Sequence, residues 1–158
     1  MADMLVSLLK IPDDREEVAA LAKEGILIRR IQPYETSVLR RFVLGNSGEG
    51  WADEVMNAFG HQPITCFVAT KEKKIIGFAA YECTCRDYFG PTCVQEAYRG
   101  KGIGKALFLA CLRGLREMGY AYGIIGGVGP KEFYAKCAGA TVIPDSAPGI
   151  YVDMLKRE

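Results

Sequence analysis

Residues 97–107 read AYRGKGIGKAL, a glycine-rich stretch that leads directly into an apolar helical pattern. The glycines occupy alternate positions, Gly100, Gly102 and Gly104, and the basic residues among them are Arg99, Lys101 and Lys105. Without a Cβ atom, glycine lets main-chain amides approach a ligand closely and lets the chain adopt positive φ. The amides that open a helix are also unpaired, and the helix macrodipole there favours an anion by about 0.3–2 kcal/mol. The stretch predicts a diphosphate site, and the competing interpretation is a glycine-rich turn with solvated basic side chains.

Two common phosphate-binding loops fail the spacing test. A Walker A loop, G-x-x-x-x-G-K-[ST], requires glycine where this chain has Arg99 and a hydroxyl residue where it has Ala106. A dinucleotide fingerprint, G-x-G-x-x-G, requires glycine at Lys105 or at Leu107. We therefore expect neither a P-loop kinase nor a Rossmann oxidoreductase.

The elements that would position this loop alternate along the chain. Helices are expected over 12–24, 33–44, 50–59, 102–118 and 130–137. Strands are expected over 26–31, 66–70, 75–83, 88–94, 121–128, 140–143 and 149–155. This order predicts an α/β architecture on a mixed sheet. Residues 1–25 are interpreted as an N-terminal helical extension to the unit formed by 26–158, with one compact domain in all.

Composition narrows the class of protein. A chain of 158 residues, 49% hydrophobic and 25% charged, suits one globular domain. A net charge of +1 predicts no nucleic-acid or lipid partner. The apolar run near the N-terminus is too short for a membrane span and lacks a cleavage pattern, so we expect an unexported, cytoplasmic protein. Six cysteines and a single histidine show no metal-ligand spacing, and we predict buried thiols and no metal site.

The spacing Arg99-x-x-Gly102-x-Gly104 resembles the [QR]-x-x-G-x-[GA] loop of the GNAT N-acetyltransferase family. TCVQEAYRGKGIGKALF is similar to that family's acetyl-CoA region, and KEFYAKCAGATVI to its later helix and strand with a tyrosine. The expected element order over 26–155 agrees with the family's plan. The resemblance implies the acyl-CoA N-acyltransferase fold, which is a single, mostly antiparallel sheet with a central splay and helices on both faces. It also implies acetyl-CoA as the co-substrate and an amine as the acceptor.

The resemblance assigns roles to particular positions. The pantetheine arm would pair with the backbone of Thr92, Cys93 and Val94, and the Val94 N–H would face the thioester carbonyl. The pyrophosphate would lie on the amides of Arg99, Gly100, Lys101, Gly102, Ile103, Gly104 and Lys105. Tyr134 falls at the family's general acid, with a packing role as the alternative. Two departures are Gly127, where the family often has Asn, and Gly139, which closes its helix one place late.

The general base and the acceptor stay open at this stage. An alkylamine with a pKa of about 10.4 is neutral in only roughly one molecule in 2,500 at pH 7, so a base is needed. Glu82, Asp87 and Glu96 are candidates, and each is also an ordinary surface acid. Direct transfer is expected because no histidine accompanies Cys93 as a nucleophile.

Trp51 suits either the acceptor wall or the core, and Tyr81, Tyr88 and Tyr151 are further candidates for that wall. The acceptor is expected to be a small-molecule amine, with an amino sugar, an amino acid, a polyamine or a protein amine all open. A homodimer also stays open. A non-catalytic acyl-CoA sensor is the alternative function.

Overall fold

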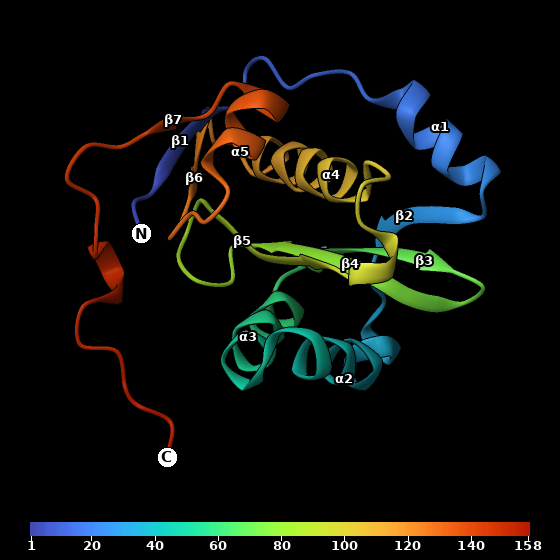
Figure 1. Cartoon of the computed structure of the whole chain (residues 1–158), viewed down its shortest axis with the longest axis horizontal. Coiled ribbons are helices and arrows are strands. Elements are labelled where there is room, and N and C mark those ends of the chain that lie inside the picture. The colour runs from blue at the N-terminus through green and yellow to red at the C-terminus, as the bar shows by residue number, and fades with distance from the viewer.

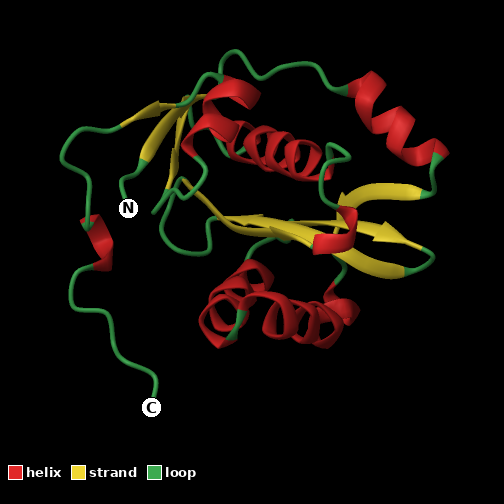
Figure 2. Cartoon of the chain, in the orientation of Figure 1, coloured by secondary structure: helices red, strands yellow, loops and turns green.

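The computed structural model describes residues 1–158, and Figures 1 and 2 show a sheet between two layers of helices. The strands are β1 Met4–Ser7, β2 Ile26–Arg30, β3 Cys66–Lys71, β4 Lys74–Tyr81, β5 Tyr88–Val94, β6 Tyr122–Ile125 and β7 Thr141–Val142. The α-helices are α1 Arg15–Lys23, α2 Thr36–Ser47, α3 Glu49–Val55, α4 Ile103–Glu117 and α5 Lys131–Ala138. Single 3-10 turns are η1 Pro33–Glu35, η2 Met56–Gly60, η3 Glu96–Tyr98 and η4 Gly149–Tyr151.

All seven strands form one sheet in the order β2-β3-β4-β5-β6-β1-β7. Every neighbouring pair is antiparallel except β5 and β6, which pair in parallel. That parallel pairing covers only Tyr88 with Ile124 and Phe89 with Ile125. Beyond these residues β5 continues to Val94 while β6 has ended, so the sheet splays at its centre. The predicted mixed sheet with a central splay is confirmed.

Helices cover both faces of the sheet. α1, α4 and α5 lie on one face, and α2 and α3 lie on the other (Figure 1). The larger core lies between the sheet and α4, and a second core of 12 buried residues lies between the sheet and the α2–α3 layer. The helical stripe predicted over 102–118 is buried as expected except at Met118, which follows the last residue of α4 and is exposed. None of the helices has both the length and the apolar character that a membrane crossing would require.

The N-terminal residues form part of the sheet, which the sequence interpretation missed. The helix expected over 12–24 is present as α1, but β1 precedes it and lies between β6 and β7. β1 pairs in an antiparallel manner with β6 from Met4 opposite Ile125 to Ser7 opposite Tyr122. Its side chains alternate, since Met4 and Val6 are buried whereas Leu5 is 39% exposed. The description of residues 1–25 as a helical extension is therefore corrected, because four residues are too short a pattern to reveal a strand whose partner lies over 100 residues away.

The strand predicted over 149–155 is wrong. Residues 149–151 form the turn η4, and the rest of the segment belongs to no strand. Gly149 and Asp153 both have positive φ, 58° and 57°, which interrupts an extended conformation. The strand that pairs with β6 on its outer side is β1. The strands predicted over 121–128 and 140–143 exist but are shorter, as β6 and β7.

The buried face of β1 gives a stability prediction. Replacing Met4, which is 2% exposed, with Ala should lower the free energy of unfolding by about 2–5 kcal/mol because it leaves a cavity in the core. Urea denaturation measures the change. Leu5→Ala on the opposite face of the same strand is the matched control and should cost less than about 1 kcal/mol. Equal losses for the two variants would contradict the placement of β1.

Candidate active site

The glycine-rich loop turns into α4 through backbone that favours glycine. Gly100 and Gly102 have φ of 81° and 85°, in the left-handed region, and Gly102 is the N-cap of α4. No side chain caps this helix, and the first backbone bond runs from the Ala106 N–H to the Gly102 carbonyl. The amides of the first turn therefore remain free donors. Gly104 differs because its φ is helical, and a Cβ there would meet only Phe133 and Val94 at ordinary contact distances of 3.6 and 3.8 Å.

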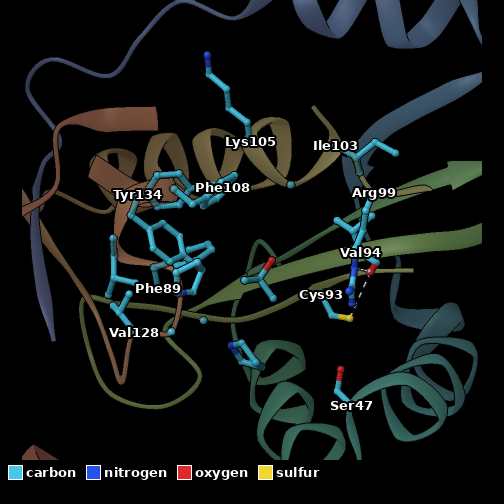
Figure 3. Close-up of a pocket in the computed structure, with 18 of the residues that line it drawn as sticks. Ser47, Phe89, Cys93, Val94, Arg99, Ile103, Lys105, Phe108, Val128 and Tyr134 are labelled. Carbon is cyan, nitrogen blue, oxygen red and sulfur yellow. Dashed lines mark hydrogen bonds between the residues drawn. The ribbon is translucent and has the colours of Figure 1, made fainter. Parts of the chain in front are cut away.

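A cavity of about 1010 Å³ opens between this loop, α4 and the splayed strands. Nine of the ten residues predicted to hold the cofactor line it: Thr92, Cys93, Val94, Arg99, Gly100, Gly102, Ile103, Gly104 and Lys105. Lys101 does not, and its ammonium group instead lies 3.6 Å from a carboxylate oxygen of Glu24. Figure 3 shows Arg99, Val94 and Cys93 at one end of the cavity and Tyr134 at the other.

The edge of β5 that faces the gap carries unpaired main-chain groups. The Gln95 N–H donates to the Ile76 carbonyl at 2.8 Å, and Val94 lies opposite Gly77 in the next pair. Because hydrogen-bonded and non-hydrogen-bonded pairs alternate in an antiparallel ladder, the amides of Val94 and Thr92 point away from β4 and into the gap. The Val94 carbonyl accepts a bond from Arg99 Nε at 3.1 Å (Figure 3). The Val94 N–H therefore faces the cavity.

Tyr134 packs in the core and also lines the cavity. It is 6% exposed, and its ring packs against Phe108 and Phe133 with centroids 5.0 and 5.1 Å apart. It also lines the cavity, and its hydroxyl makes no hydrogen bond with another residue. Burial raises the pKa of Tyr134 to about 12, with smaller contributions from the nearby thiols of Cys137 and Cys111. The phenol therefore keeps its proton at neutral pH.

The acidic candidates are not brought to Tyr134. The Asp87 N–H donates to the Glu82 carboxylate, so these two residues lie together, but neither lines the cavity. Burial, and then the charge of Glu82, raises the pKa of Asp87 to about 6. Glu96 lies in η3 and also does not line the cavity. No carboxylate and no histidine lines the cavity, and no group of three potential metal ligands forms in the chain.

Other residues complete the wall, and sequence reasoning found only some of them. Trp51 of α3 lines the cavity and is 42% exposed, so it belongs to the cavity wall rather than to the core. Asn46 and Ser47 at the end of α2 were not predicted. The turn after β6 was also missed, although its glycine-rich sequence, GGVGP over 126–130, was a signal. The buried carboxylate of Asp3 accepts the Gly127 N–H at 2.8 Å and supports that turn.

Comparisons with known proteins agree with this geometry. Residues 62–137 match the family model described as an acetyltransferase (GNAT) domain. A GCN5-related glucosamine N-acetyltransferase region of a fungal multi-domain GH3 β-N-acetylglucosaminidase superposes with a TM-score of 0.71 at 20% identity, over 90% of this chain and 19% of that chain. A GCN5-related N-acetyltransferase from Sphaerobacter thermophilus superposes with a TM-score of 0.70 at 19% identity, over 90% of this chain and 48% of that one.

The family match and the shared fold identify a GNAT acetyltransferase domain in this chain. The chain spans less than half the length of the two structures just described. A comparison of the sequence with curated proteins finds no match.

The raised pKa of Tyr134 predicts a specific loss of stability at high pH. Its pKa is about 12 in the folded protein against 10.0 ordinarily, so the folded state keeps this proton at a higher pH than the unfolded chain does. This proton contributes on the order of 2 kcal/mol to the free energy of unfolding. The contribution is complete below pH 10 and is lost as the pH rises to about 12. Urea denaturation across this range should show a steeper decline for the wild type than for Tyr134→Phe. Parallel curves would contradict the burial of the phenol.

Proposed function

We propose that the protein is an acetyl-CoA-dependent N-acetyltransferase that moves an acetyl group directly to a primary amine of a small molecule. One arrangement supports this most strongly. A single cavity joins the free amides of a helix N-terminus, the open edge of β5 and the protonated phenol of Tyr134. A diphosphate, an extended amide-containing arm and a thioester carbonyl would meet these three features in that order.

The residues present suit coenzyme A. The free amides at the start of α4 and the charges of Arg99 and Lys105 would hold the pyrophosphate. The main-chain groups of Thr92 and Val94 that point into the gap would pair with the pantetheine arm. Arg99 Nε now bonds to the Val94 carbonyl, so the arm would have to displace this contact in order to pair there.

The chemistry of transfer follows from two donors. When an amine attacks a thioester, negative charge develops on the carbonyl oxygen, and the Val94 N–H would donate to it. Tyr134 would donate to the departing sulfur. Full proton transfer from a phenol with a pKa of about 12 to a thiolate resembling that of Cys, pKa about 8.5, costs about 5 kcal/mol. The main contribution of Tyr134 is therefore a hydrogen bond to the sulfur while the C–S bond breaks.

The amine must lose a proton before it attacks. For an alkylamine at pH 7 this costs about 4.6 kcal/mol. Because no carboxylate or histidine lines the cavity, the proton would leave through water rather than directly to a side chain. The same absence of a base favours the second candidate, a non-catalytic acyl-CoA sensor, as does Gly127 in the place of the family's Asn.

Release of free thiol from acetyl-CoA across a panel of amines distinguishes these two functions. Glucosamine belongs in the panel because it is named for the fungal region of similar fold. We expect turnover with at least one amine, and Tyr134→Phe should lower kcat by about 10²–10⁴-fold with little change in affinity for CoA. Tyr98→Phe, which removes a phenol hydroxyl from the same cavity, is the matched control. Tight CoA binding without turnover in the wild type would indicate a sensor, and full kcat in Tyr134→Phe would exclude Tyr134 as the hydrogen-bond donor to the departing sulfur.

Gly102 tests the location of the cofactor. Valine at φ of 85° is strained by about 1–3 kcal/mol, so Gly102→Val should rearrange the start of α4 and weaken CoA binding at least tenfold. Calorimetry measures the affinity and circular dichroism checks the fold. Gly119→Val, at the other end of α4 with φ of 104° and similarly open space, carries matched strain away from the cavity and should retain CoA binding. Unchanged affinity in Gly102→Val would mean that the site lies elsewhere.

A further inference from the structure

The C-terminal segment, residues 144–158, crosses from β7 toward α3. Figure 1 shows it running along the side of the molecule where β5 and β6 meet. It is attached at both ends. The Ser146 hydroxyl accepts the Asp3 N–H at 2.8 Å, and the Arg157 guanidinium lies 3.4 Å from carboxylate oxygens of both Glu49 and Asp53. The segment therefore bridges the N-terminal strand and the α2–α3 layer.

Tyr151 lies in the middle of this segment and packs on the wall of the cavity. A Cβ atom built on Gly126 would lie only 2.9 Å from the Tyr151 hydroxyl oxygen and 2.9 Å from the Tyr88 ring. A Cβ on Gly127 would lie 3.2 Å from the Tyr151 ring. Gly126 and Gly127 both line the cavity, at the end away from the glycine-rich loop. Only glycine allows the two tyrosine rings to approach the chain this closely.

Carboxylates act on both Tyr151 and Tyr88. Burial, and then the carboxylates of Glu54 and Asp3, raises the pKa of Tyr151 to about 12. Burial and the charge of Asp3 also raise the pKa of Tyr88. Glu54 accepts a hydrogen bond from the Thr84 hydroxyl, and it lies one helical turn after Trp51, which lines the cavity.

We propose that Tyr151, which packs against the lining residues Gly126 and Gly127 without lining the cavity itself, is a specificity-determining residue, and that its ring and Tyr88, with Glu54 and Asp3, favour amines that lack a carboxylate over amino acids. This inference rests on the proposed acetyltransferase function. An ammonium group is attracted both to the faces of aromatic rings and to carboxylates. A carboxylate on the acceptor would instead lie on the same side as Glu54 and Asp3, which are placed outside the lining of the cavity, and like charges repel. The chemical class that fits is a compact cation with no anionic group.

Pairs of acceptors that differ by one carboxylate provide the test. Cadaverine against lysine and tyramine against tyrosine form two such pairs, assayed by free-thiol release. The wild type should show a kcat/KM at least tenfold higher for the member without the carboxylate. Glu54→Gln should reduce that ratio at least fivefold. Tyr151→Ala should raise the acceptor KM at least tenfold while the affinity for CoA, measured by calorimetry, stays within twofold.

Tyr34→Ala is the control, because Tyr34 lies in η1, is 82% exposed and does not line the cavity. If Tyr151→Ala does not fold, Tyr151→Leu keeps the apolar bulk, removes the ring and is judged by the same measurements. The inference is overturned if the wild type is active but the Tyr151 variants have the same acceptor KM as Tyr34→Ala. It is also overturned if Glu54→Gln leaves the kcat/KM ratio of the paired acceptors unchanged. A wild type that binds CoA but acetylates no amine would refute the proposed function instead.

Discussion

The brief parallel contact between β5 and β6 is the constraint on which the site depends. Two residue pairs hold the strands together, and from Gly90 onward β5 has no neighbour on that side. A buried amide without a partner is costly, so a strand edge that opens inside the molecule requires a ligand or water. The amides of Thr92 and Val94 meet this condition. The proposed pantetheine arm would complete the sheet at the place where the protein leaves it incomplete.

The same separation allows α4 to point its N-terminus at the opening. α4 is anchored by ten buried residues, and its first turn emerges beside the end of β5. Phe108 on this helix and Phe89 on β5 both pack against Tyr134, with ring centroids 5.0 and 6.0 Å from the Tyr134 ring. The packing that buries the phenol also keeps it protonated. A packing tyrosine and a proton-donating tyrosine are therefore compatible at this position.

The two ends of the cavity are built differently. The end at the glycine-rich loop uses continuous sequence, from β5 through the loop to α4, whereas the turn after β6 is packed by Asp3, Tyr88 and Tyr151, which come from three separate segments. β1 takes the position next to β6, and the C-terminal segment is thereby left to cross to α3. Because the C-terminal segment is not a strand of the sheet, Tyr151 can pack on the turn that follows β6.

The sequence alone was sufficient for the glycine-rich loop and the helix after it. The need for glycine at 100 and 102 and the start of α4 depend on residues close together in the chain, where local conformation and spacing carry the information. The open edge at Val94 was an expectation from the family resemblance, and it exists because β6 ends before β5 does. The tertiary structure decided what depends on distant pairing. It placed β1 beside β6, kept residues 149–155 out of the sheet, left Glu82 and Asp87 outside the lining of the cavity, and brought Asp3 and Tyr151 to the turn that follows β6. A short strand pattern and an isolated acid do not reveal their partners, because the free energy that selects those partners comes from burial and hydrogen bonding across the whole fold.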